Sequence, residues 1–117
     1  MIYHITERGA WNEAKLHGSY SAPTLATEGF IHCSRRSQVA SVADDFYRGQ
    51  SGLLLLCIDE DRLTAELRWE APAHPQPKSA SATSGEAKFP HLYGPLNLDA
   101  VLEVLDFVEA DEGFKLP

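Results

Sequence analysis

Three histidines lie in short apolar segments that are far apart along the chain. His4 is followed two positions later by Thr6 and His32 by Ser34, while His91 lies in a third mixture of apolar and polar residues. Side chains alternate between the two faces of a β-strand, so each of the first two histidines shares a face with its hydroxyl partner. Three such segments predict a polar pocket that is lined by strands.

Histidines in such a pocket bring two kinds of chemistry. A neutral imidazole orients hydroxyl groups, and a pKa of about 6.5 also lets it transfer protons near physiological pH. Three imidazoles are in addition a ligand set for zinc. No spacing here is diagnostic of a metal site, so we expect no metal. The structural alternative is that each histidine only satisfies its own hydrogen bonds in the core.

Other polar side chains accompany the histidine segments. Arg35 and Arg36 follow Ser34 at the predicted start of a helix, and a helix N-terminus with an arginine is a natural site for an anion. Gln38 lies in the first turn of that helix, where it either contacts a ligand or completes the cap. Tyr93 follows His91 and either stacks on a flat ring or points its hydroxyl to water.

The composition is that of one soluble globular domain over residues 1–117, with 44% hydrophobic and 23% charged residues. A net charge of −7 without a basic run disfavours duplex nucleic acid as a partner. No apolar run approaches the roughly 20 residues that span a bilayer, and the N-terminus lacks a secretion signal, so we expect no membrane partner and a cytoplasmic location. Cys33 and Cys57 lack a paired spacing and are predicted to be reduced core thiols.

Hydrophobic periodicity and turn residues predict the elements. Val39, Val42, Ala43 and Phe46 form a helical stripe that is expected to rest on the core. The predicted elements are a strand at 2–6, a helix at 8–16, an irregular connection at 19–28, a strand at 30–33, a helix capped by Ser34 and running through Arg48, strands at 53–58, 65–70 and 89–93, a mobile loop at about 71–88, a helical turn at 98–101, a strand or helix at 102–108 and an unassigned tail from Asp111. Two helices in the N-terminal half and short strands after them indicate an α+β fold.

The motifs together resemble the DUF952 family, whose function is unknown. The resemblance rests on Tyr3-His4-Ile5-Thr6, on Gly29-Phe30-Ile31-His32-Cys33-Ser34 with Gln38, and on Pro90-His91-Leu92-Tyr93-Gly94-Pro95, in that order. It covers nearly the whole chain, apart from the segment 71–88. It implies the split two-sheet fold of the ADP-ribosyltransferases, with short, mostly antiparallel strands. The oligomeric state is not indicated.

The resemblance also implies a nucleotide site. His4 and Thr6 match the position that binds the ribose of NAD in that superfamily, and Ser34 or His32 matches the nicotinamide side. The late acidic residue of many transferases has no secure counterpart, although Glu70 ends a predicted strand. The late motif contains His91 and Tyr93 instead.

The function expected from the sequence is therefore binding of NAD or a related nucleotide, with transfer or release of ADP-ribose. One alternative is a module that binds a small ligand without turnover. The other is a two-histidine phosphoesterase-like enzyme, in which two histidine–hydroxyl pairs hold a phosphate. The expected catalytic residues are His4, His32 and His91, and the expected ligand-binding residues are Thr6, Ser34, Arg35, Gln38 and Tyr93.

Overall fold

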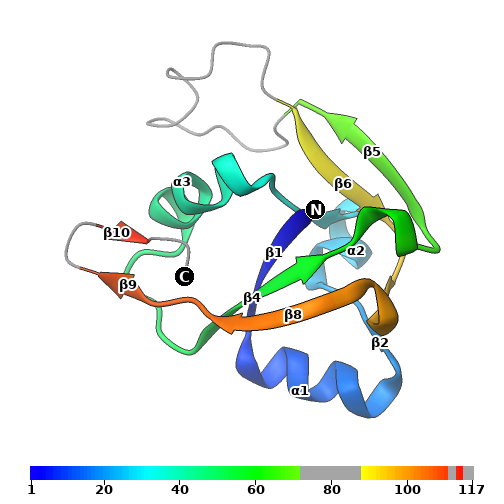
Figure 1. The fold of residues 1–117 in the computed structure, drawn as a ribbon, viewed down its shortest axis with the longest axis horizontal. Coiled ribbons are helices and arrows are strands. Elements are labelled where there is room, and N and C mark those ends of the chain that lie inside the picture. The colour runs from blue at the N-terminus through cyan, green and yellow to red at the C-terminus, as the bar shows by residue number, and fades with distance from the viewer. Residues whose placement is uncertain (72–87, 111–112, 115–117) are drawn as a thin grey trace.

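In the described part of the chain, two three-stranded antiparallel sheets and three helices form the framework (Figure 1). The computed structural model describes residues 1–71, 88–110 and 113–114, so the loop expected at about 71–88 lies almost wholly outside the described residues. The first sheet has the order β1 (Ile2–Glu7), β4 (Leu53–Ile58), β8 (Val101–Asp106), and the second has the order β3 (Ile31–His32), β6 (Phe89–Tyr93), β5 (Glu66–Glu70). The α+β class is therefore confirmed.

Strand β4 is the centre of the first sheet. All six of its residues are buried, and it lies between β1 and β8. Leu54, Leu56 and Ile58 join one core cluster, while the alternate residues of the strand join a second cluster on the other face. Burial on both faces explains why this segment has an unbroken apolar run instead of an alternating pattern.

Helix α1 (Arg8–His17) and helix α3 (Arg36–Phe46) correspond to the two predicted helices. Gly18 ends α1 at a φ of 88°, a conformation that glycine adopts without steric cost. The prediction for α3 was wrong at both ends, because Arg35 is the N-cap and the helix stops before Tyr47. Gln38 performs the capping expected of Ser34: its Oε1 accepts from the Arg35 N–H at 2.9 Å.

The segment predicted as an irregular connection contains strand β2 (Ser19–Tyr20) and a third helix, α2 (Pro23–Glu28). Proline at the first position of a helix needs no N–H donor and already has a helical φ. Ala22 before it is extended, as a residue before proline prefers. Pro23 therefore keeps Ala22 extended and also begins helix α2.

The remaining elements are short. β2 pairs with β7 (Leu96–Asn97), and β9 (Glu109–Ala110) pairs with β10 (Gly113–Phe114). Only β10 belongs to the tail from Asp111 that the sequence left unassigned. Single turns of 3-10 helix cover Glu60–Arg62 and Leu98–Ala100. Cys33 and Cys57 are buried and free, as predicted. None of the described helices has the length and apolar character needed to cross a membrane.

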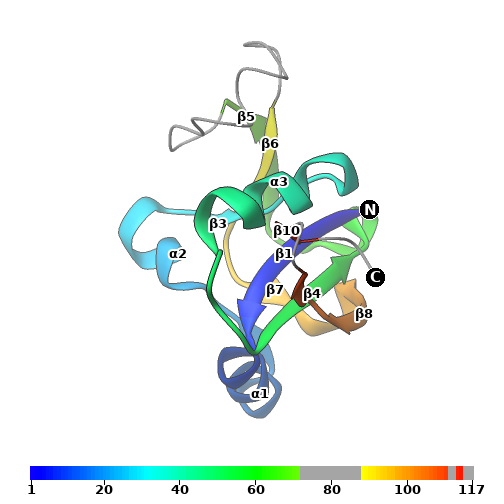
Figure 2. The same cartoon turned by 90° about the vertical axis from the view of Figure 1, so that its left-hand side faces the viewer.

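The two large sheets meet at one point. Tyr3 of β1 and Ser34 after β3 exchange two backbone hydrogen bonds of 2.8 Å. Figure 2 shows α3 lying across β1 there, with α2 and β3 beside it. Beyond Tyr3, the outer edge of β1 is paired with no other described strand.

Candidate functional site

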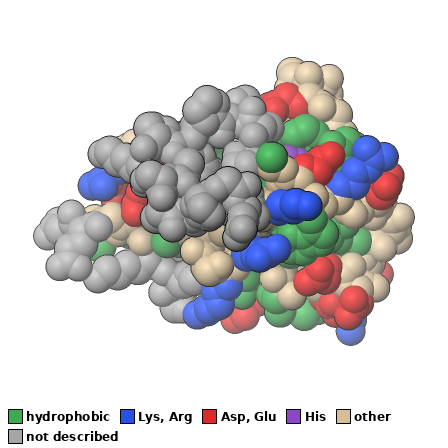
Figure 3. Space-filling model, turned by 90° about the horizontal axis from the view of Figure 1, so that it is seen from above, with side chains coloured by type: hydrophobic (Ala, Val, Ile, Leu, Met, Phe, Trp, Pro, Cys, Tyr) green, Lys and Arg blue, Asp and Glu red, His purple; other side chains and the backbone are tan. Residues whose placement is uncertain are grey.

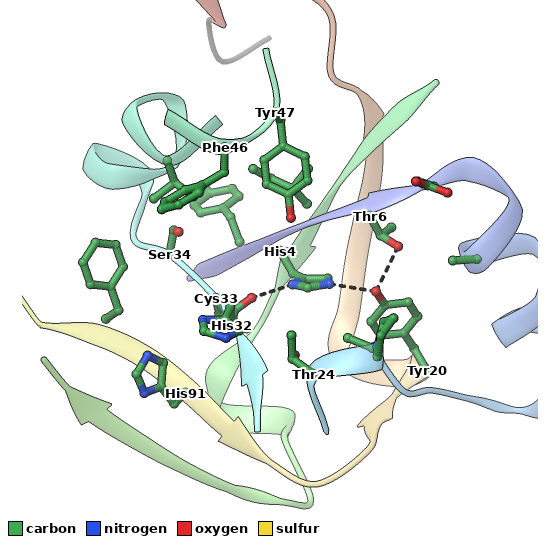
Figure 4. Close-up of a pocket in the computed structure, with 18 residues that line it drawn as sticks. His4, Thr6, Tyr20, Thr24, His32, Cys33, Ser34, Phe46, Tyr47 and His91 are labelled. Atoms are coloured by element: carbon green, nitrogen blue, oxygen red, sulfur yellow. Dashed lines mark hydrogen bonds between the residues drawn. The ribbon is translucent and has the colours of Figure 1, made fainter. Parts of the chain in front are cut away.

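A cavity of about 510 Å³ lies along this outer edge of β1 (Figure 4). Its volume falls in the range of small-molecule sites. Strand β1 and the β3 segment form two walls, the start of α2 forms a third, and the last turn of α3 covers the opposite side. The lining residues that matter below are His4, Thr6, Glu7, Tyr20, Thr24, His32, Ser34, Phe46, Tyr47 and His91.

The structure brings all three predicted histidines to this one cavity. His4 comes from β1, while His32 and His91 are directly opposite each other in the antiparallel pair β3–β6. The rings of His32 and His91 have centroids 5.6 Å apart in an edge-on arrangement. The side chain of His32 also lies 3.1 Å from the Glu28 carboxylate of α2, measured from Nε2 to Oε1.

His4 is held by hydrogen bonds at both ring nitrogens. Its Nδ1 lies 2.6 Å from the carbonyl oxygen of His32 and its Nε2 lies 2.8 Å from the hydroxyl of Tyr20. Burial lowers the pKa of His4 to about 4, so the ring is neutral near pH 7. Because a carbonyl oxygen only accepts, Nδ1 carries the proton and donates it there.

The proton positions in the rest of this chain follow from the His4 tautomer. Nε2 of His4 has a lone pair, so the Tyr20 hydroxyl donates to it and has no second proton to give. The Thr6 hydroxyl, 2.9 Å from that of Tyr20, is then the donor to Tyr20. His4 and Thr6 are therefore satisfied by the protein itself, and His4 is a fixed wall of the cavity rather than a proton carrier at neutral pH.

Removal of the Tyr20 hydroxyl should destabilise the protein. In Tyr20→Phe, two buried partners lose their shared hydrogen-bonding group while the ring remains in place. We expect the free energy of unfolding, measured by urea denaturation, to fall by about 1–3 kcal/mol. The control is Tyr47→Phe, which removes the hydroxyl of another cavity tyrosine and should change stability by less than about 0.5 kcal/mol. Equal losses in the two variants would contradict the hydrogen-bonded chain.

A second polar cluster lies where β5 and β6 pair. Glu70 Oε1 accepts from His91 Nδ1 at 2.8 Å and from the Tyr93 hydroxyl at 2.5 Å. These two hydrogen bonds, with that of Tyr93 the larger influence, hold the pKa of Glu70 below its usual range. The same bond to Glu70 raises the pKa of Tyr93. The ring of His91 stacks on Phe30 with centroids 4.1 Å apart.

Several hydroxyl groups of the cavity lining have no hydrogen-bond partner among the described residues. They include those of Ser34, Thr24 and Tyr47. Figure 4 shows the Tyr47 hydroxyl directed toward β1 and His4. Burial, followed by the nearby charge of Glu7, raises the pKa of Tyr47, so its hydroxyl remains a donor at neutral pH. The polar groups that the protein leaves open to a ligand are therefore mainly hydroxyls.

Arg35, Gln38 and Tyr93 were predicted to bind the ligand but do not line the cavity. The guanidinium of Arg35 lies 4.7 Å from the centre of the Trp69 ring. The amide of Gln38 caps α3 and donates to the Lys88 carbonyl at 2.9 Å, and the hydroxyl of Tyr93 is bonded to Glu70. These contacts give all three residues a structural explanation. Thr6 and Ser34, also predicted to bind the ligand, do line the cavity.

Sequence reasoning missed Tyr20, Tyr47 and Thr24 as cavity residues. Tyr20 and Thr24 lie in the segment predicted to be irregular, and Tyr47 follows the helical stripe that ends at Phe46. Phe46 was assigned to the core, yet it is 45% exposed and lines the cavity. The sequence signal for this wall of the cavity was the pair of aromatic residues, Phe46 and Tyr47, at the end of the apolar stripe of α3.

The charge at the cavity is negative. The described lining residues include one carboxylate, Glu7, and no lysine or arginine. Figure 3 shows a histidine next to acidic side chains on the side of the molecule where β5 and β6 lie. In the described part of the chain, no three His, Cys, Asp or Glu side chains are arranged to hold a metal ion. The site therefore favours an uncharged or cationic group over a bare phosphate.

Comparison with known proteins identifies relatives without an assigned activity. Residues 5–104 match the model of a family described as "Protein of unknown function (DUF952)". The X-ray crystal structure of protein CC0527 from Caulobacter crescentus has 33% sequence identity and a TM-score of 0.79, with 97% of this chain and 90% of that chain covered. The solution NMR structure of CC0527 gives 33% identity and a TM-score of 0.75, over 97% and 89% of the two chains. No curated protein matches the chain.

Proposed function

This chain belongs to the DUF952 family, and from its cavity we propose that it binds NAD or a related nucleotide and transfers or releases ADP-ribose. The nicotinamide ring and the ribose attached to it occupy the cavity. The phosphates remain outside, where solvent screens them from the negative charge of the protein. The family match itself carries no activity, so the proposal depends on the chemistry of the cavity.

The observation that carries the proposal is the combination of open hydroxyls, aromatic walls and a single carboxylate in one cavity. The oxidised nicotinamide ring is flat and positively charged, which suits the rings of Phe46 and Tyr47 and the charge of Glu7. Ribose hydroxyls suit the hydroxyl groups of Ser34 and Thr24. A cavity with these groups and without lysine or arginine supports the ring and sugar of NAD better than its diphosphate.

The place of the cavity supports the same proposal. It lies beside the Tyr3–Ser34 bridge that joins the two large sheets, which accords with the proposed likeness to the split two-sheet fold of the ADP-ribosyltransferases. His4 and Thr6, which match the ribose-binding position, lie on its wall. With both nitrogens bonded, His4 offers the ligand the edge of its ring and orients Tyr20.

Transfer of ADP-ribose breaks the bond between ribose C1′ and the nicotinamide nitrogen. The bonding electron pair leaves with nicotinamide, which becomes neutral, and positive charge develops on the ribose. The protein must then hold the sugar in place and stabilise that charge. The Ser34 hydroxyl and the His32 side chain orient the sugar, and an acceptor oxygen forms the new bond at C1′.

A second candidate is a binding module that does not turn its ligand over. The observation that favours it is the state of His4, whose pKa of about 4 and two occupied nitrogens remove it from proton transfer at neutral pH. The same observation weakens the phosphoesterase alternative, which needs His4 to move a proton. That alternative also places a phosphate in a cavity with no described lysine or arginine in its lining.

Incubation with NAD separates the candidates. Calorimetry should detect binding of NAD, and chromatography should detect released nicotinamide, whereas a binding module gives the first signal only. Ser34→Ala should weaken NAD binding by roughly 3- to 10-fold, the value of one hydrogen bond, and the control Ser41→Ala, on the exposed face of α3, should not. A titration with 2′,3′-cyclic nucleotide and with ADP-ribose tests the other ligands. If NAD gives no heat and no nicotinamide, the proposal is wrong.

A further inference from the structure

Glu70 determines which nitrogen of His91 carries the proton. Both His91 Nδ1 and the Tyr93 hydroxyl point at the same carboxylate oxygen, at 2.8 and 2.5 Å. An ionised carboxylate only accepts hydrogen bonds, so Nδ1 must be the protonated nitrogen of the neutral ring. The second nitrogen, Nε2, then has a lone pair.

The ring of His91 cannot easily turn away from this orientation. It is 2% exposed, stacks on Phe30 with an angle of 22° between the rings, and meets the ring of His32 edge-on. Glu70 and Tyr93 themselves come from the neighbouring strands β5 and β6, which pair in regular register. Packing and hydrogen bonding therefore fix both the position and the tautomer of the imidazole.

The lone pair of His91 is left for the cavity. Nδ1 points to Glu70, which is outside the cavity lining, whereas the His91 side chain is part of that lining. Nε2 is on the other side of the ring and has no hydrogen-bond partner among the described residues. Figure 4 shows the ring beside that of His32 at the wall of the cavity.

We propose that Glu70 is a positioning residue that holds His91 as a proton acceptor, with Nε2 directed into the cavity. This arrangement differs from that of His4, whose Nε2 is already occupied by Tyr20. The two buried histidines of the site thus have different roles: His4 is structural, and His91 is the base. Tyr93 supports Glu70 through its hydroxyl.

The reaction of this base rests on the proposed function. Nε2 of His91 takes the proton of a water molecule or of an alcohol that attacks ribose C1′. The new C1′–O bond forms as the C1′–N bond breaks, and its electron pair leaves with nicotinamide. The products are nicotinamide, the ADP-ribosylated oxygen and a protonated His91, which returns its proton to solvent.

The charged groups around His91 come from strands β5 and β3 and from helix α2. Arg68 of β5 is its register partner, but its guanidinium is paired with Glu66 and lies 4.4 Å from the centre of the Tyr93 ring. His32 of β3 is paired with Glu28 of α2. Glu70 is therefore the one described carboxylate in hydrogen-bond contact with the His91 ring, so its removal is the specific test.

Glu70→Ala should change the His91 tautomer and abolish activity together. In ¹⁵N-histidine-labelled protein, long-range ¹⁵N–¹H spectra should show His91 protonated at Nδ1, and the Glu70→Ala variant should show protonation at Nε2 or a mixture. Nicotinamide release should fall by about 100-fold or more in kcat with little change in KM, because a general base contributes that much.

Two matched variants complete the test. Glu66→Ala removes another carboxylate of β5 that does not contact His91 and should leave both readouts as in the native chain. Tyr93→Phe keeps the Glu70–His91 pair and should keep the Nδ1 tautomer. Native His91 protonated at Nε2, or an unchanged tautomer in Glu70→Ala, would overturn the inference. If the tautomer changes as expected but NAD is never cleaved, the dyad stands and the proposed function fails.

Discussion

Between pH 6.5 and pH 4 the protein is expected to lose about 3 kcal/mol of its unfolding free energy through His4 alone. The folded pKa of about 4 lies below the value of 6.5 for an ordinary histidine, because the ring is buried. In this window the unfolded chain binds a proton at His4 and the folded chain does not. The contribution of His4 to stability is therefore complete above pH 6.5 and is lost as the pH decreases toward 4. The loss is a large part of the 5–15 kcal/mol that is typical of the unfolding free energy of a domain.

Urea denaturation at a series of pH values measures this loss. His4→Gln should reduce stability at pH 7, since it disturbs the bonds to His32 and Tyr20, but it should flatten the slope between pH 6.5 and 4.5. His17→Gln is the matched control, because it makes the same exchange on the exposed surface of α1. The pKa of Glu70 is lowered as well, so the stability that Glu70 contributes is lost only when the pH falls below the ordinary carboxyl value of 4.5. If His4→Gln kept the native slope of unfolding free energy against pH, protonation of buried His4 would not be the cause of the loss.

Local pattern was enough to predict the main elements. The unbroken apolar run of β4 and the alternation of β5 both reflect burial, on two faces and on one face respectively. Helix α2 was missed because its six residues contain no buried side chain and therefore no periodic apolar stripe. The pairing of β9 with β10 was missed because two-residue strands depend on a partner, here on the contact of Phe114 with Phe107 and on the Asp44 carboxylate.

The cavity shows a similar division between what is local and what is tertiary. That histidines from three segments share one cavity followed from their matching strand contexts. Which of them has an unoccupied nitrogen did not follow, because that depends on Tyr20 and Glu70, 16 and 21 positions away along the chain from His4 and His91. The contacts of Arg35 with Trp69 and of Gln38 with the Lys88 carbonyl did not follow from the sequence for the same reason.

A large side chain in place of Thr24 should block the ligand without unfolding the protein. Thr24 is the second residue of α2, is half-buried, and its side chain points into the cavity, as Figure 4 shows. A tryptophan there would occupy a substantial part of the roughly 510 Å³ now open. We expect Thr24→Trp to weaken NAD binding by about 100-fold or more, equivalent to at least about 3 kcal/mol. Isothermal titration calorimetry measures this directly.

Stability separates blocking of the cavity from loss of the fold. The indole would bury apolar surface against Phe46 and Val42, so the melting temperature of Thr24→Trp should match or exceed that of the native chain. The control is Thr27→Trp, the same exchange on the exposed side of the same helix, which should bind NAD as the native chain does. Native affinity in a folded Thr24→Trp variant would place the ligand elsewhere, because two bulky groups cannot share the space between α2 and β1. Equal loss in both variants would instead point to α2 itself, and the cavity would no longer explain the binding.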